Sequence, residues 1–188
     1  MKPEADHKSQ LIHVLHMAYS GEKAAAYAYN AHWKSLKNPA ERESIRRIEH
    51  EEIEHREIVG VMLEKLGNGP QPWREVLMAC IGRSVGIACY LIGWFLPMYF
   101  AGRLESSNIK EYDVAATHAE ALGMTEEAKT LMRLSSVEAQ HEEFFLQTIA
   151  NHPLLPLMHR IFGWGVHTTP LPPGAQPCLN VEDSQFLS

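Results

Sequence analysis

Two stretches of this chain place a glutamate and a histidine, three residues apart, in the middle of an otherwise apolar helical stripe. In the first stretch, Glu52 and His55 keep the same spacing of three and four residues as the apolar positions around them. In the second stretch, Glu138 and His141 are likewise in phase with their apolar neighbours. Residues at this spacing share one face of a helix, so both pairs are predicted to point into a helical core.

Two further apolar stripes each carry a single acid. Glu22 lies in phase with apolar residues in the first part of the chain, and Glu105 does so in the third. Each acid precedes a Glu-x-x-His pair by a similar distance, which is thirty residues from Glu22 to Glu52 and thirty-three from Glu105 to Glu138. The chain is therefore interpreted as two copies of a helix pair.

Four acids on core faces predict bound cations, because burying an unpaired carboxylate costs several kcal/mol or forces its protonation. Carboxylate and imidazole ligands together favour iron or manganese, whereas magnesium and calcium prefer oxygen alone. Two divalent ions would satisfy all four acids and leave open positions for dioxygen or peroxide. We therefore expect two iron ions, with manganese as the alternative, on metal-binding and catalytic residues Glu22, Glu52, His55, Glu105, Glu138 and His141.

Other tyrosines, acids and histidines of the chain have simpler interpretations than metal binding. A lone Glu-x-x-His is usually a solvated surface pair, but two in-phase pairs, each preceded by an acid, are hard to obtain by chance. Tyr27, Tyr29 and Trp33 are interpreted as packing residues. Tyr112 is expected to approach the site, with Asp113 and Glu142 as weaker candidates for contacts to the ligands. The remaining histidines are interpreted as surface or ordinary core residues: His13, His16, His32, His50, His118, His152, His159 and His167.

Helical periodicity dominates the chain, and signals for β-strands are scarce. The predicted fold is an all-α four-helix bundle over residues 9–165 with a short additional C-terminal helix. The expected helices span about 9–36, 38–66, 73–122, 125–151 and 154–164, and Pro97 is expected to kink or divide the third. The proline-rich tail, residues 166–188, is expected to be extended or partly disordered.

Composition narrows the class of protein. The 188 residues suit one domain, and a formal net charge of −6 argues against nucleic acid as the main partner. Cys80, Cys89 and Cys178 form no CxxC pair, which favours a reducing compartment. The polar N-terminal segment lacks the apolar stretch of a secretory signal. A cytoplasmic location is therefore expected.

Several motifs resemble the ferritin-like di-iron superfamily and, within it, the demethoxyubiquinone hydroxylase family. YSGE, ending at Glu22, resembles the HAGE of that family, and EIEH and EAQH, which begin at Glu52 and Glu138, resemble its two Glu-x-x-His motifs. The glycine-spaced apolar run that ends at Glu105 is similar to the third-helix segment of the family. The likeness spans roughly residues 10–165, with departures at Tyr19, Pro97 and Glu111. It implies a ferritin-like bundle and a di-iron monooxygenase of ubiquinone biosynthesis.

Residues 84–102 form nineteen positions without a formal charge. This length could span a membrane, but Glu105 follows at once and must reach the core, so a partly buried helix with an apolar outer face is favoured. The expected location is peripheral to the inner membrane. The expected partners are a small hydrophobic, quinone-like substrate, dioxygen, a reductant that the sequence does not identify, and a membrane surface or a second copy in a homodimer.

Three other functions remain open on the same residues. One is a ferroxidase or rubrerythrin-like peroxide scavenger, although the apolar third helix fits a storage shell poorly. A tRNA-modifying di-iron hydroxylase is disfavoured by the acidic charge. The last is a non-enzymatic metal-binding bundle that the ions stabilise.

Overall fold

The computed structural model describes residues 3–165, and this part of the chain is all-helical, without strands. The all-α prediction and the short C-terminal helix are confirmed. The tail predicted for residues 166–188 lies outside the described residues. The helices are α1 (Pro3–Ser35), α2 (Pro39–Lys65), α3 (Pro72–Leu91), α4 (Phe95–Ala121), α5 (Thr125–Ile149) and α6 (Leu155–Phe162).

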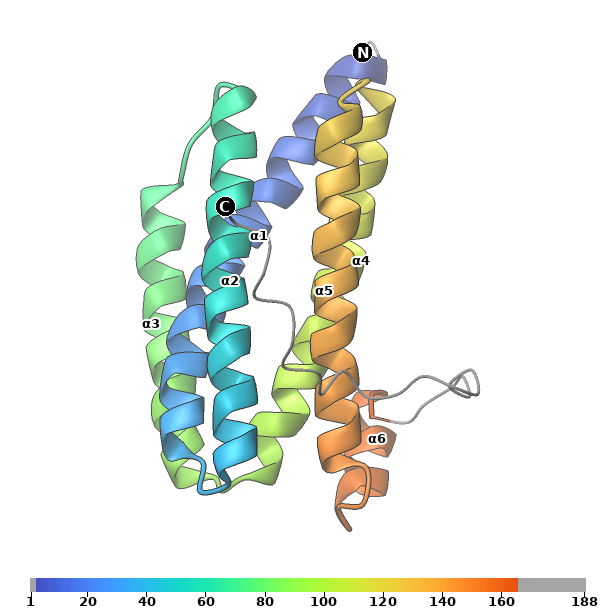
Figure 1. Ribbon diagram of the computed structural model, residues 1–188. Coiled ribbons are helices and arrows are strands. Elements are labelled where there is room, and N and C mark those ends of the chain that lie inside the picture. The colour runs from blue at the N-terminus through green and yellow to red at the C-terminus, as the bar shows by residue number, and fades with distance from the viewer. Residues whose placement is uncertain (1–2, 166–188) are drawn as a thin grey trace, which may run out of the picture.

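Four long helices run roughly along one direction, and two shorter elements are attached to them (Figure 1). α1 packs against α2, and α4 packs against α5, so each half of the chain contributes one antiparallel pair. α1 also contacts α4, which joins the two pairs. α3 lies on the outside of α1, and α6 lies at the end of α5 near the start of α4 (Figure 1).

Helix boundaries follow local signals. The Asn38 side chain caps α2 by accepting a hydrogen bond from the backbone N–H of Ala40 at 2.9 Å. The predicted third helix is divided, but the break lies at residues 92–94, where Gly93 adopts a φ of 80°. Pro97 was the wrong place for that break. It sits in the first turn of α4, where a backbone N–H has no partner within the helix.

The apolar core forms two clusters with a polar layer between them. One cluster joins the N-terminal half of α1 to the C-terminal halves of α2 and α4 and to the start of α5. The other joins the C-terminal half of α1 to the start of α2 and α4, the end of α5, and α6. On α1 the clusters reach Ala18 and Ala25, and Glu22 lies between these residues. The acids therefore occupy a layer closed from both ends by apolar side chains.

Small residues hold α3 on α1. Its buried positions are Ala79, Gly82, Gly86 and Cys89, all on one face. A Cβ at Gly86 would lie 2.7 Å from the Ala31 Cβ, and one at Gly82 would overlap the Ala24 carbonyl oxygen. The two helix backbones approach closely because neither of these positions carries a side chain.

Replacement of Gly82 by alanine is expected to destabilise the protein by roughly 1–3 kcal/mol, because the Ala24 backbone cannot move aside as a side chain would. Urea unfolding followed by circular dichroism would measure the change. Gly21→Ala is the matched control, because a Cβ there meets nothing within 4 Å and removing a helical glycine stabilises by about 0.5–1 kcal/mol. Equal midpoints for the two variants would contradict this account of the α1–α3 contact.

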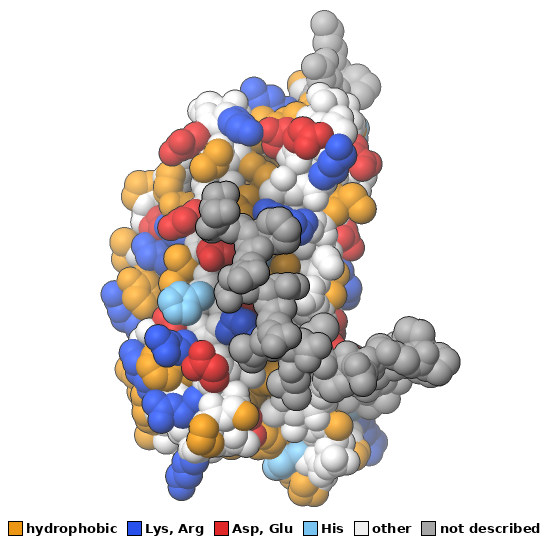
Figure 2. All heavy atoms as spheres, in the orientation of Figure 1, with side chains coloured by type: hydrophobic (Ala, Val, Ile, Leu, Met, Phe, Trp, Pro, Cys, Tyr) orange, Lys and Arg blue, Asp and Glu red, His pale blue; other side chains and the backbone are white. Residues whose placement is uncertain are grey.

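The outer face of α3 is apolar and exposed. The side chains of Trp73, Val76, Ile87 and Leu91 are more than half exposed. Figure 2 shows hydrophobic side chains, interspersed with lysine and arginine, along the edge of the molecule where α3 lies. Over residues 3–165, the length and hydropathy of every helix fall short of what crossing a membrane requires.

Candidate metal centre

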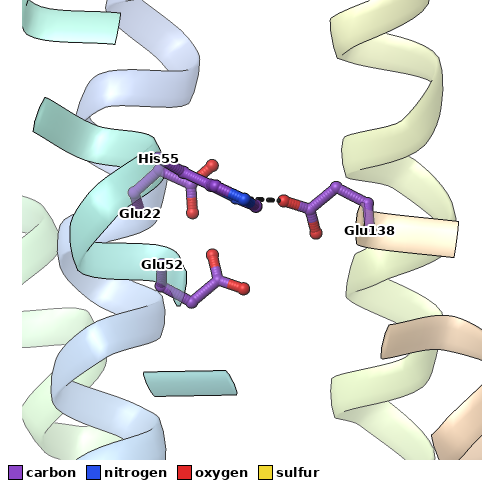
Figure 3. A group of neighbouring side chains, drawn as sticks. All are labelled: Glu22, Glu52, His55 and Glu138. Carbon is purple, nitrogen blue, oxygen red and sulfur yellow. Dashed lines mark hydrogen bonds and ion pairs between the residues drawn. The ribbon is translucent and has the colours of Figure 1, made fainter. Parts of the chain in front are cut away.

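The six residues predicted as ligands lie together in the polar layer, on four different helices. Glu22 comes from α1 and Glu105 from α4, while α2 and α5 each supply one Glu-x-x-His pair. All six side chains are buried, with exposed fractions of 4% or less. Figure 3 shows Glu22, Glu52 and His55 facing Glu138 across the gap between α1–α2 and α5.

The ligand atoms form two overlapping groups. Glu22, Glu52, His55 and Glu138 make one group, and Glu52, Glu105, Glu138 and His141 make the other, with the ligand atoms of each group within 4.8 Å of one another. Glu52 and Glu138 belong to both groups. Each group thus has one histidine and one acid of its own and shares two carboxylates with its neighbour. Either group could hold a metal ion.

Several ligand atoms in this layer have no hydrogen-bond partner within residues 3–165. They are one oxygen of Glu22, both oxygens of Glu52 and the Nδ1 atom of His141. The Nδ1 of His141 lies 3.3 Å from a Glu52 oxygen without forming a hydrogen bond. Buried polar atoms are normally paired, so atoms left over on facing side chains indicate a place for a cation. The residues present therefore fit a metal ion.

The electrostatics of the layer point the same way. Burial raises the pKa of Glu52 well above its usual range, and the charges of Glu22 and Glu138 raise it further. Burial, followed by the charge of Glu138, also raises the pKa of Glu105. Although burial opposes ionisation of Glu138, the nearby His141 and the hydrogen bond from His55 hold the pKa of its carboxyl below the usual range. Without a cation, these acids cannot all be ionised together.

The two histidines of the metal layer, His55 and His141, have different hydrogen-bond partners. His55 Nδ1 lies 2.8 Å from a Glu138 oxygen, the pair joined by the dashed line in Figure 3. His141 Nε2 donates to Glu51 at 2.7 Å, which leaves its Nδ1 facing the acids. Although burial opposes charge, the nearby Glu138 carboxylate and the hydrogen bond to Glu51 raise the pKa of His141 to about 9. Glu51 therefore fixes the ring orientation that a metal-binding imidazole needs.

Two buried tyrosines tie the helix pairs together. The Tyr112 hydroxyl on α4 donates to Glu22 on α1, and the Tyr29 hydroxyl on α1 donates to Glu105 on α4. Each tyrosine comes seven residues after the acid of its own helix and bonds the acid of the other. The expected approach of Tyr112 to the site is confirmed. Tyr29 packs in the core, as interpreted, and its hydrogen bond to Glu105 was not predicted.

Other polar contacts of the layer differ from those expected. Asn108 on α4 donates to Glu105 at 3.0 Å, and this contact was not predicted. Asp113 accepts from Ser135 at 2.7 Å, and Glu142 accepts from the Trp164 indole at 2.7 Å. The recorded hydrogen bonds of these two acids therefore lead away from the six residues. The contacts to the predicted ligands that were expected of Asp113 and Glu142 are instead made by Glu51 and Asn108.

An apolar cavity of about 590 Å³ lies between α1, α3 and α4. It reaches the metal layer, because Glu22, Tyr29 and Tyr112 are among the residues that line it. Nearly all of its other walls are apolar, from α1, from the inner face of α3 and from the first half of α4. The cavity is therefore suited to a hydrophobic molecule that lies beside the acids.

His32 borders the same cavity and is buried rather than exposed. Its Nε2 atom has no hydrogen-bond partner in the described part of the chain. Burial lowers the pKa of His32 from its usual value of 6.5 to about 4, so the ring is neutral at pH 7. Among the histidines interpreted as surface or ordinary core residues, His32 is a buried core residue.

A pH dependence of stability follows from His32. Because its folded-state pKa lies below its unfolded value, the unfolded chain takes up the proton first, and stability is lost as the pH falls from 6.5 towards 4. Between pH 7.5 and 5 this amounts to about 2 kcal/mol. Urea unfolding of His32→Leu is expected to lose that much less over the same interval. The exposed His50 supplies the control, His50→Leu. Parallel curves for both variants would refute the assignment.

Comparisons of the chain with protein-family models, with curated proteins and with solved structures find no match. The fold and the site nevertheless define a class. Residues 3–165 are all-helical and carry a buried cluster of carboxylates and histidines that could hold metal ions.

Proposed function

We propose that this chain is a ferritin-like di-iron monooxygenase that hydroxylates a hydrophobic, quinone-like or aromatic ring, as the demethoxyubiquinone hydroxylase family does. In this proposal α1, α2, α4 and α5 form the four-helix bundle of that superfamily. The observation that carries the proposal is the pair of overlapping ligand groups beside an apolar cavity. Bundle proteins with two Glu-x-x-His helices and two further acids hold di-iron or di-manganese centres.

Iron is the metal that this donor set favours. Glu22 and His55 would hold one ion, Glu105 and His141 the other, and the carboxylates of Glu52 and Glu138 would be shared. Two imidazoles among carboxylates weigh against calcium and magnesium, while manganese remains the alternative. Bound iron supplies the redox chemistry by which dioxygen, with two electrons from a reductant, delivers one oxygen atom to a substrate and releases the other as water.

The residues of the chain supply position and a dry environment. Apolar cavity walls border the face of the layer where Glu22 and Tyr112 lie. The Tyr112 and Tyr29 hydroxyls and the Asn108 amide hold Glu22 and Glu105 in place by hydrogen bonds. Burial keeps the tyrosine hydroxyls protonated, because it raises the pKa of Tyr29 and Tyr112 well above the usual range. These protons remain on the tyrosines as the acids change charge.

The exposed apolar face of α3 supports a location at a membrane surface. A lipid-soluble substrate would reach the cavity from that side, because the inner face of the same helix lines it. Flotation with phosphatidylcholine vesicles is expected to carry the protein upward. Leu91→Ser on α3 should weaken flotation, and Val114→Ser, an exposed position of α4, should not. Recovery of all wild-type protein from the lipid-free fraction would count against this location.

Two measurements test the proposed reaction. Protein expressed with iron should contain about two iron ions per chain and show the charge-transfer absorption of a ferric site. Cells that lack the gene should accumulate a quinone precursor without one ring oxygen, detected by mass spectrometry of a quinone extract. An unchanged quinone pool would reject ubiquinone biosynthesis. Consumption of peroxide without any hydroxylated product would favour the peroxide-scavenging alternative, and consumption of neither oxidant would favour a non-enzymatic metal-binding bundle.

A further inference from the structure

One cation, Arg74, lines the apolar cavity without forming an ion pair within residues 3–165. Arg74, in the first turn of α3, donates from Nε to the Ser20 hydroxyl at 3.2 Å and from Nη2 to the Met17 sulfur at 2.8 Å. Both partners are uncharged. Among the described residues, no carboxylate oxygen lies within 4.0 Å of its nitrogens. A guanidinium offers five N–H donors, so most of the donors remain available.

Arg74 stands at the end of the cavity that is nearest to the metal layer. Its partner Met17 precedes Glu22 by five residues, which is roughly 8 Å along α1. Asn108, Glu111 and Tyr112 of α4 line the same cavity. A group bound to Arg74 would therefore lie at the end of the cavity that Glu22 and Tyr112 also line.

The cavity becomes apolar away from Arg74. α3 follows it from Arg74 to Cys89, about 22 Å along the helix. Val85, Ile92, Leu96 and Phe100 line this stretch. With the Arg74 donor at one end and apolar walls along the rest, the cavity matches an amphipathic molecule with one polar head.

We propose that Arg74 anchors the head of the substrate, an uncharged ring oxygen such as a carbonyl, while an apolar tail lies along α3. The assignment rests on the proposed function, and it names the part of the substrate that selects it. Hydrogen bonds from charged donors are roughly twice as strong as neutral ones, and they gain further in surroundings of low dielectric. Arg74 therefore fixes which ring carbons face Glu22.

Glu111 sets the charge of the accepted head. It lines the cavity on α4, where burial raises its pKa and the nearby Arg74 opposes that rise. An ionised Glu111 repels a carboxylate head, and a protonated Glu111 can donate to a carbonyl oxygen. A neutral acceptor is compatible with both states, so it is favoured over an anion.

Binding of matched ligands to the iron-loaded protein tests the assignment. The probes are hexylbenzene, 4′-hexylacetophenone and 4-hexylbenzoate, measured by displacement of the neutral fluorophore N-phenyl-1-naphthylamine. The ketone is expected to bind about tenfold more tightly than hexylbenzene, as one charge-assisted hydrogen bond would give. Tighter binding of the benzoate than of the ketone would overturn the neutral head.

Variants separate the anchor from general effects. Arg74→Met should bring the two affinities within about twofold by weakening ketone binding alone, and Arg74→Lys should keep part of the preference. Arg83→Met is the matched control, because Arg83 is an exposed residue of the same helix that stacks on Tyr27 outside the cavity lining. Glu111→Gln should tighten benzoate binding several-fold, because it removes the negative charge that repels the carboxylate.

The outcomes also separate this assignment from the proposed reaction. A tenfold preference retained in Arg74→Met, or absent from the wild type, would overturn the anchor whether or not the protein hydroxylates anything. A preference that depends on Arg74 in a protein without hydroxylase activity would keep the anchor and reject the reaction. Unfolding midpoints of Arg74→Met and Arg74→Lys close to that of the wild type establish that folding is not the cause.

Discussion

Glutamine in place of Glu52 is expected to lower the iron content from about two ions per chain to one or fewer. Glu52 belongs to both ligand groups and makes no hydrogen bond within residues 3–165, so its oxygens have no other evident role. Loss of a supporting residue around a metal typically costs 10–100-fold in activity, so loss of this ligand should exceed about 100-fold. Elemental analysis of desalted protein, together with an assay of product formation, measures both effects.

Glu54→Gln is the control for this substitution. Glu54 lies two residues further along α2 and is exposed, so the change in charge is the same while the metal layer is untouched. Its iron content should match that of the wild type. Two ions per chain in Glu52→Gln would remove Glu52 from the ligand set and leave the shared-carboxylate arrangement without support.

Removal of iron by a chelator is expected to destabilise the protein and to make its stability depend on pH. In the metal-free layer the folded-state pKa values of Glu52 and Glu105 lie above their unfolded value of 4.5. Their protonation stabilises the fold at low pH, and this stability is lost as the pH rises through the raised values. The unfolding free energy should fall by up to about 1.4 kcal/mol per pH unit for each proton released. The iron-loaded protein should vary much less.

Urea unfolding between pH 6.5 and 8.5 measures this slope, in an interval where the opposite effect of His32 is small. His141 adds to the slope, because its folded-state pKa of about 9 also lies above its unfolded value. Metal-free Glu52→Gln should be more stable than metal-free wild type at pH 8, since one buried acid is gone. A metal-free wild type as stable as the loaded protein at every pH would mean that no cation balances this layer.

Helical periodicity was enough to predict the six buried side chains of the metal layer. A glutamate on an apolar stripe has one direction to point, so Glu22 and Glu105 could be placed without knowing how the helices pack. The same spacing argument could have found Tyr29, which follows Glu22 by the seven residues that separate Glu105 from Tyr112. It was missed because an aromatic residue on a core face is usually interpreted as packing.

The supporting contacts and the cavity depend on distances between helices, which a single sequence does not contain. Glu51 sits in a run of acids on α2, and only the position of His141 on α5 distinguishes it from Glu54. The break at Gly93 folds α3 back along α1 and so creates the cavity. The sequence indicated a break at Pro97, and the structure places it a few residues earlier.

Cutting the chain between α2 and α3 would leave neither piece with a complete ligand group. The first piece would hold Glu22, Glu52 and His55, and the second Glu105, Glu138 and His141, while each group needs a carboxylate from the other piece. The tyrosine hydrogen bonds cross the same divide in both directions. The ions would then act as a covalent cross-link does in a two-chain protein, and metal supply would decide whether the two pieces assemble at all.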